Sequence, residues 1–229
     1  MRHALSAVLA IAAIFSTTPA AAVPVTWHMT GEVTSGNLGD FFFPFQTNAG
    51  DAIAFDFTFD TQTACSLCEP NSRVYDNPLT AFSLTVGDKV FTPPLGASSI
   101  LLRNDWESPA GGFFLDALTF EIGGEDASGL FFHGDLVVQN TSSTVPVAGF
   151  DDTQLTTLTP PDPALFADPS LSFFGFDAQS SDGGFDSFSG RFLTSSVVST
   201  PEPAALALLL PGMLLVWFVG RRASRRSAR

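Results

Sequence analysis

Basic side chains are scarce over most of this 229-residue chain. Between residues 23 and 200 only Arg73, Lys89, Arg103 and Arg191 occur, against 22 of the chain's 23 acidic residues, so this region carries a formal charge of −18 while the whole chain carries −13. A surface this acidic repels nucleic acid and anionic lipid headgroups. Nucleic acid is therefore excluded as a partner, and neutral glycans, divalent cations and basic surfaces remain.

Helical periodicity and tyrosine are also nearly missing. No long segment of residues 23–200 repeats its apolar residues at helical spacing. One tyrosine stands against 24 phenylalanines, so the core must be built mainly from rings that lack a polar group. Motifs of metalloproteases, phosphate loops and nucleophile elbows are absent too, and with them the clearest sequence signs of an enzyme.

Apolar and polar residues instead alternate along many short segments. In residues 55–60 three phenylalanines alternate with Asp56, Thr58 and Asp60, which is typical of a half-buried strand. Further strands are predicted at residues 25–33, 82–86, 89–92, 100–104, 113–122, 130–139 and 185–198. Short strands with glycine-rich turns and no intervening helix predict an all-β domain at residues 23–199, an antiparallel β-sandwich of jelly-roll-like form.

Two segments fit this alternation poorly. Consecutive strand residues point to opposite faces, so Phe41-Phe42-Phe43-Pro44-Phe45 is predicted to be an edge strand or a loop folded over the end of the sandwich. Residues 141–169 are rich in Thr, Pro and Asp and are predicted to form a long surface loop.

The first 22 residues have the pattern of a secretory signal peptide. Arg2 precedes an apolar stretch, and the small residues Ala20-Ala21-Ala22 follow it. Such a peptide directs export through the inner membrane, and cleavage after Ala22 is expected to leave Val23 as the first residue. A lipoprotein is not expected, because no cysteine precedes Cys65.

The only two cysteines, Cys65 and Cys68, form a C-x-x-C motif. In an exported chain this pair is predicted to form a disulfide, which stabilises modestly because it closes a very short loop. A redox role would need a neighbouring βαβ unit. Zinc would need two more ligands, and the candidates His28 and His133 lack finger spacing, so the structural disulfide is favoured.

The C-terminal residues 200–229 combine three features in a fixed order. Pro201-Glu202-Pro203 precedes an uncharged apolar run at residues 204–220, which as a transmembrane helix would span roughly 25 Å. The tail at residues 221–229 contains Arg221, Arg222, Arg225, Arg226 and Arg229. Clustered arginines hold their side of a membrane helix in the cytoplasm, and the prolines favour an extended motif on the outer side. From these features alone a permanently membrane-anchored ectodomain is an equal alternative.

This order of features resembles the sorting signal of PEP-CTERM proteins, which bacterial exosortases recognise. The resemblance covers residues 200–229 and implies that exosortase is a partner, that Pro201, Glu202 and Pro203 are the sorting motif, and that the membrane helix is transient. It also implies that the processed protein reaches the cell surface or the extracellular space. Because family members typically occur in bacteria that make exopolysaccharide, a non-catalytic protein of the extracellular matrix or biofilm is expected, with exopolysaccharide as a candidate partner.

Calcium is the one metal that the acid excess suggests. Asp177, Asp182 and Asp186 surround Gly183-Gly184 and form the densest oxygen-rich turn, but no EF-hand or glycine-rich calcium repeat accompanies them. The alternative is that these acids cap strands and keep the protein soluble. No cofactor is therefore expected beyond this calcium hypothesis.

Paired carboxylates are the remaining sign of catalysis. Glycoside hydrolysis needs two carboxyl groups at a set separation, and Asp56 with Asp60 or Asp116 with Glu121 are the candidate pairs. With 22 acids in the domain, such pairs arise by chance, so no catalytic residue is predicted and the chain is not expected to be an enzyme.

A carbohydrate-binding or polysaccharide-acting domain is the alternative function. Sugar rings stack on exposed aromatic faces, so Trp27 and Trp106 bear on this alternative. It loses its main support if both tryptophans are buried, and it gains support if they flank one concave face.

Overall fold

The computed structural model describes residues 24–36, 42–160 and 171–198. The signal peptide predicted at residues 1–22 and the sorting signal predicted at residues 200–229 lie outside these ranges. Within them, no helix is long and apolar enough to cross a membrane.

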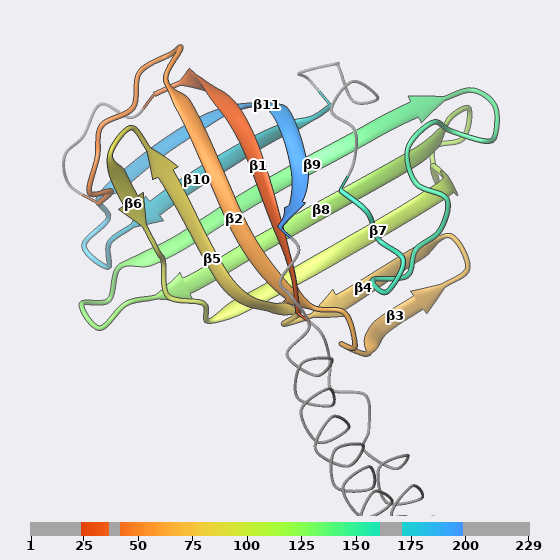
Figure 1. The fold of residues 1–229 in the computed structure, drawn as a ribbon, viewed down its shortest axis with the longest axis horizontal. Coiled ribbons are helices and arrows are strands. Elements are labelled where there is room, and N and C mark those ends of the chain that lie inside the picture. Colours follow the sequence, from red (N-terminus) through yellow and green to blue (C-terminus); the bar gives the residue numbers. More distant parts are fainter. Residues whose placement is uncertain (1–23, 37–41, 161–170, 199–229) are drawn as a thin grey trace, which may run out of the picture. The chain divides into compact units, whose positions relative to one another are not determined.

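Eleven strands make up the described domain, which confirms the all-β prediction (Figure 1). They are β1 (Pro24–Ser35), β2 (Ala52–Asp60), β3 (Cys65–Glu69), β4 (Ser72–Asp76), β5 (Leu79–Val86), β6 (Lys89–Phe91), β7 (Ala97–Glu107), β8 (Phe114–Glu125), β9 (Phe131–Ser142), β10 (Phe173–Gln179) and β11 (Phe185–Val198). All neighbouring strands pair antiparallel, in the order β3-β4-β7-β8-β9-β10-β11-β1-β2-β5-β6.

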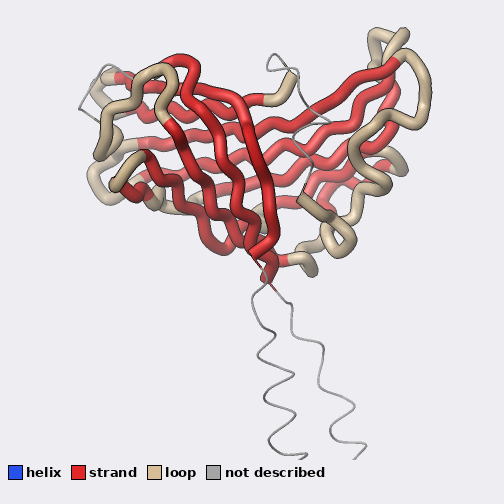
Figure 2. The backbone as a smooth tube through the Cα atoms, turned by 45° about the horizontal axis from the view of Figure 1, so that its top comes forward, coloured by secondary structure: helices blue, strands red, loops and turns tan. Residues whose placement is uncertain are grey.

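These strands belong to one continuous sheet, so the prediction of two separate sheets in a jelly-roll-like sandwich is wrong. The sheet curls until β1, β2 and β5 lie across the face of β8, β9 and β10 (Figures 1 and 2). Unbroken pairing from β10 through β11 to β1 joins the two halves. Alternation of apolar and polar residues gives each strand one buried face, which needs a second layer to cover it. Because β10, β11 and β1 pair without a break, both layers come from one sheet.

Glycines mark the place where the sheet bends between β11 and β1. The register shifts between Thr30 and Gly31, and such irregularities increase local twist. A Cβ atom on Gly190 would lie 2.2 Å from Cζ of Phe174 and from the Glu32 carbonyl oxygen, and one on Gly31 would lie 2.6 Å from Cε1 of the same ring. Because neither glycine has a side chain, the Phe174 ring packs directly against the backbone at the bend.

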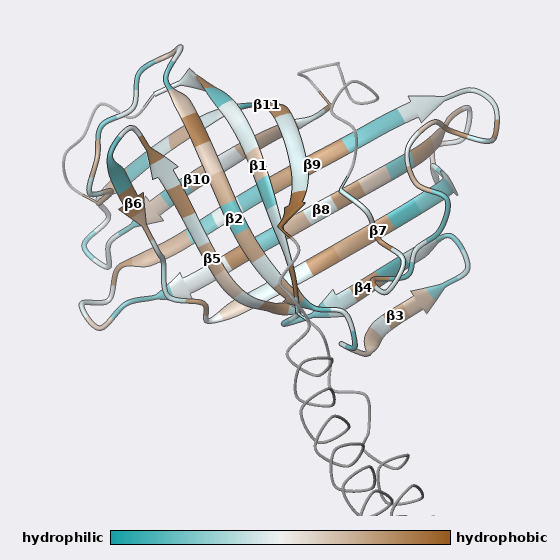
Figure 3. Cartoon of the chain, in the orientation of Figure 1, coloured by the Kyte–Doolittle hydropathy of each residue, from teal (hydrophilic) through white to brown (hydrophobic). Residues whose placement is uncertain are grey.

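The space between the two layers is filled mainly by aromatic rings. Apolar and polar residues alternate along β2 (Figure 3), and the three phenylalanines of residues 55–60 are at most 1% exposed. From this strand Phe55 reaches Phe174 at 4.9 Å and Phe57 reaches Phe120 at 4.4 Å between ring centroids. These contacts join residues far apart in the sequence, so the core holds the two layers of the curled sheet together.

The phenylalanine run before β2 forms a loop, one of the two forms predicted for it. Within its described part, Phe43 and Phe45 are buried and Phe42 is half-buried. Phe43 packs 5.0 Å from Phe188 and 5.6 Å from Phe91. This segment therefore closes one end of the core rather than offering a ligand platform.

Of the surface loop predicted at residues 141–169, residues 143–160 form a loop without strands that contributes apolar residues to the interior. Residues 141 and 142 still belong to β9, and residues 161–169 lie outside the described ranges. Val147, Phe150 and Leu155 on this loop are buried. The loop is held by Asp116 of β8, whose Oδ2 accepts a hydrogen bond from the Phe150 N–H at 2.8 Å, and by Tyr75 of β4, whose hydroxyl donates to the Thr153 carbonyl at 2.8 Å. It therefore covers the inner face where the second layer does not reach.

Candidate functional site

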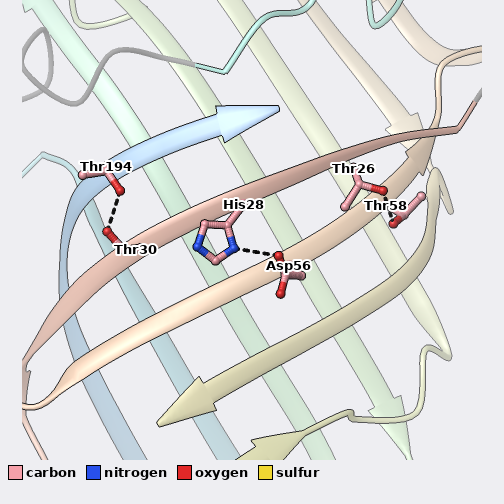
Figure 4. Close-up of polar contacts among 6 residues, drawn as sticks. All are labelled: Thr26, His28, Thr30, Asp56, Thr58 and Thr194. Carbon is pink, nitrogen blue, oxygen red and sulfur yellow. Dashed lines mark hydrogen bonds and ion pairs between the residues drawn. The ribbon is translucent and has the colours of Figure 1, made fainter. Parts of the chain in front are cut away.

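Two groups of polar side chains lie on the outer face of the curled sheet. The first crosses β11, β1 and β2, where alternation places hydroxyls, an imidazole and a carboxylate on one face (Figure 4). Its contacts are Thr26 Oγ1 with Thr58 Oγ1 at 2.8 Å, His28 Nδ1 with Asp56 Oδ1 at 2.7 Å, and Thr30 Oγ1 with Thr194 Oγ1 at 2.6 Å. Directly opposed pairs of this kind stabilise antiparallel strands.

The His28–Asp56 pair resembles the oriented base of a nucleophilic site, and Ser196 of β11 is the register partner of His28 on its other side. A nucleophile and its base must come within hydrogen-bond reach. Among the described residues no hydrogen bond joins Ser196 to His28. We therefore assign these residues to pairing between strands.

The second group surrounds His133 on the outer face of β9. Its Nδ1 lies 3.3 Å from Oδ1 of Asp177 on β10, and its Nε2 lies 3.7 Å from Oδ1 of Asp135. Glu121 of β8 is the register partner of Asp135 and accepts a hydrogen bond from Ser99 at 2.8 Å. Burial raises the pKa of Asp135, with Glu121 and Asp177 acting in the same direction and His133 opposing them.

A shallow groove of about 620 Å³ adjoins this group. Its lining includes Glu121 and Glu125 of β8, His133 and the exposed Phe131 of β9, and Asn77 after β4. Three glycines, Gly96, Gly123 and Gly124, add backbone without side chains. The groove can therefore offer hydrogen-bond acceptors and one aromatic face to a ligand. The sequence suggests only a zinc ligand at His133, because no local pattern shows that four strands bring these residues together.

The proposed calcium ligands do not converge. Asp177 lies on the outer face of β10, whereas Asp186 of β11 is buried opposite Ala178 on the inner face. Asp182 sits in the turn between them, where the Ser180 hydroxyl donates to its carboxylate and, with the Gly184 N–H, lowers its pKa. Among the described residues, no group of three or more His, Cys, Asp or Glu side chains has an arrangement suited to a metal ion.

The four carboxylates proposed as catalytic pairs differ in their surroundings and hydrogen-bond partners. Asp116 is fully buried on the inner side of β8, while Glu121 is exposed on the outer side, so the two cannot act on one substrate. Oδ1 of Asp116 accepts from the Asp105 N–H at 2.7 Å, and burial raises its pKa despite this bond. Asp56 is bound to His28, and Oδ1 of Asp60 accepts from the Gln62 N–H at 2.8 Å in the turn after β2.

The structure joins Cys65 to Cys68 by a disulfide within the edge strand β3, which confirms that prediction. The two Cα atoms lie 5.8 Å apart, and no free cysteine remains. His28 and His133, the proposed additional zinc ligands, are hydrogen-bonded to aspartates on other strands.

The two tryptophans do not form one platform. Trp27 is 0% exposed and packs against Phe59 and Phe120 in the core. Trp106 on β7 is half-buried beneath Arg103, whose guanidinium carbon lies 4.3 Å from the ring centroid, a cation–π contact. Burial lowers the pKa of Arg103. Trp27 therefore offers no face to a sugar, while Trp106 is half-buried with Arg103 over one face of its ring.

No protein-family model matches the chain, and no curated protein or solved structure was found to be similar to it.

Proposed function

We propose that this chain is an exported substrate of an exosortase, and that its β domain acts outside the cell as a non-catalytic matrix-associated or surface protein. The observation that carries the proposal is the order of Pro201-Glu202-Pro203, the apolar run at residues 204–220 and the arginine tail. The three features occur once, in the sequence order of a PEP-CTERM signal. The resemblance indicates where the domain is delivered, and it does not indicate an activity.

One feature of the fold suits this role. β1 begins at Pro24 and pairs with the end of β11, with Thr26 opposite Val198. The proposed signal-peptide cleavage site after Ala22 comes just before β1, and the motif starting at Pro201 comes just after β11. Both are therefore only a few residues from the same end of one strand pair. Only Ser199 and Thr200 separate Val198 from Pro201, so Val198 and Pro201 can lie at most about 11 Å apart along the chain. A processing enzyme would work close to the folded domain.

The test compares the protein made in a host with exosortase and in an otherwise identical host that lacks it. We expect intact mass to show loss of the native tail near Pro203, and fractionation to show release from the membrane, only where exosortase is present. Glu202→Ala should block both changes, because it alters the motif. Asp88→Ala is the matched control, since it removes an acid that is 89% exposed in the turn between β5 and β6.

An arginine tail that persists in both hosts contradicts the proposal. The chain would then be a permanently membrane-anchored ectodomain. Equal processing of the native chain and the Glu202→Ala variant would show cleavage that does not depend on the motif.

A further inference from the structure

Four residues in register form a row on the outer face of the sheet, at one end of strands β8 to β11. Glu125 pairs with Phe131, Phe131 with Gln179, and Gln179 with Phe185. We name these four residues the aromatic row. Phe131 is 45% exposed and Phe185 is 64% exposed, while their chain neighbours Phe132 and Asp186 point to the inner face and are buried. Two large rings are thus held on rigid strands in contact with solvent.

The spacing of the two rings follows from the sheet. Phe131 and Phe185 lie two strands apart, and neighbouring strands are about 4.8 Å apart, so the rings stand roughly 10 Å from each other along a line that crosses the strands. Gln179 between them is polar and exposed. The apolar area is therefore divided into two separate platforms and is not one continuous patch of the kind that marks a protein interface.

A row of polar groups lies directly beside the aromatic row. Gly123 pairs with His133, His133 with Asp177, and Asp177 with Ser187. His133 and Asp177 keep 39% and 34% of their side-chain surface exposed while they contact each other. The groove of about 620 Å³ begins at Phe131 and His133 at the β9 end of the two rows. It continues over Gly123, which has no side chain, to Glu121 of β8 and on to β7 and β4. Hydrogen-bonding side chains therefore line the same groove as an exposed ring.

We infer that the aromatic row and the polar row beside it bind a neutral polysaccharide, which lies across strands β8 to β11. Exposed rings stack on the C–H faces of sugars, and a separation of roughly 10 Å lets Phe131 and Phe185 stack on two different sugar units of one chain. Carboxylates and imidazole hydrogen-bond to sugar hydroxyls. Glu121, Glu125 and Asp177 would repel an anionic polymer. The inference deepens the proposed function, on which it rests only for where the ligand is encountered.

Affinity gel electrophoresis of the full chain tests this inference. The chain would be purified in a zwitterionic detergent without a sugar headgroup and run through gels that contain hydroxyethyl cellulose, galactomannan or dextran, with alginate as the anionic comparison. We expect at least one neutral polymer to retard the protein, and alginate not to do so. Phe131→Ala and Phe185→Ala should each weaken retardation by about tenfold in dissociation constant.

Leu67→Ala is the matched control, since Leu67 is 54% exposed on β3 at the far edge of the sheet. Its retardation should equal that of the native chain. Phe185→Trp should retain binding, because the larger ring keeps the platform. All these positions are exposed, so circular dichroism melts should coincide and show that each variant is folded.

Absence of retardation in all three neutral gels overturns the inference, as does equal retardation of the native chain and the Phe131→Ala/Phe185→Ala double variant. Stronger retardation by alginate than by the neutral polymers also overturns it, because the carboxylates would not then select the ligand. None of these results depends on tail cleavage. The sorting proposal therefore stands or fails separately, by the mass of the tail.

Discussion

Asp116 of β8 holds Phe150 of the covering loop through one hydrogen bond, in which the Phe150 N–H donates to Oδ2 at 2.8 Å. The other oxygen of the same carboxylate accepts from the Asp105 N–H at 2.7 Å. A fully buried carboxylate thus connects the covering loop to the irregular stretch of β7 between Arg103 and Trp106, where the register with β8 shifts. Loss of this group would remove the acceptor of both hydrogen bonds.

Asp116→Ala is therefore expected to destabilise the domain by about 3 kcal/mol, because buried donors without partners cost about 1–3 kcal/mol each and the site can relax partly. Urea unfolding followed by near-ultraviolet absorption or fluorescence would measure the change. Asp60→Ala is the control, since Asp60 makes a comparable backbone bond in a solvent-exposed turn. A loss no greater than that of the control would show that the carboxylate does not hold the loop.

The same carboxyl group predicts a pH dependence of stability. Burial raises the folded-state pKa of Asp116 above its ordinary value of 3.8. At pH values between the unfolded-state pKa and the folded-state pKa, the folded state therefore binds more protons than the unfolded state. The contribution of the group to stability is fully present below pH 3.8 and is lost as pH rises through the folded pKa. Asp116→Asn does not titrate, so the unfolding free energy of the native protein minus that of the variant should fall as pH rises from about 3 to 7. A constant difference would contradict the shift.

Gly190→Ala is expected to destabilise the domain by about 1–3 kcal/mol, because a Cβ atom there would lie 2.2 Å from Cζ of Phe174 and from the Glu32 carbonyl oxygen. Gly175→Ala is the matched control on the neighbouring strand, where an added Cβ meets no atom within 4 Å. Thermal melts of the two variants should separate clearly. Equal melting temperatures would mean that the bend tolerates a side chain and that the close approach is not required.

Removal of the disulfide is expected to have a small effect. Cys65 and Cys68 are three residues apart in the edge strand β3, and a loop this short removes little chain entropy, about 2 kcal/mol or less. The Cys65→Ser/Cys68→Ser variant should remain folded and lose at most this amount in urea unfolding. A dithiothreitol-treated native sample should match it. Complete unfolding of either sample would show that β3 and β4 depend on the bond.

Most of the fold prediction rested on the alternation of apolar and polar residues. The three phenylalanines of residues 55–60 and their polar neighbours predict β2, its buried face and its exposed face, because side chains alternate in any strand. Three strands escaped prediction, β3, β4 and β10. Residues 173 and 174 are both phenylalanine, which breaks the pattern of β10, and the contrast between exposed Phe173 and buried Phe174 arises only from packing against the bend.

The candidate site was less accessible to sequence reasoning. Phe131 and Phe185 are 54 residues apart, and no local feature separates them from the many phenylalanines that fill the core. Their exposure follows from the register of β9, β10 and β11. Trp27 was the better candidate for sugar stacking by residue type, yet its place in the alternation of β1 directs its side chain into the core.

The sequence by itself determined that this is an all-β domain with an aromatic core, an acidic surface and a local disulfide, because period, composition and short spacing are local properties. Only the tertiary structure decided that the strands form one curled sheet and which side chains meet on its outer face. Those outcomes depend on pairing between distant strands, such as β1 with β11. A register change of one residue would exchange every inward and outward side chain of a strand, and no short stretch of sequence records that choice.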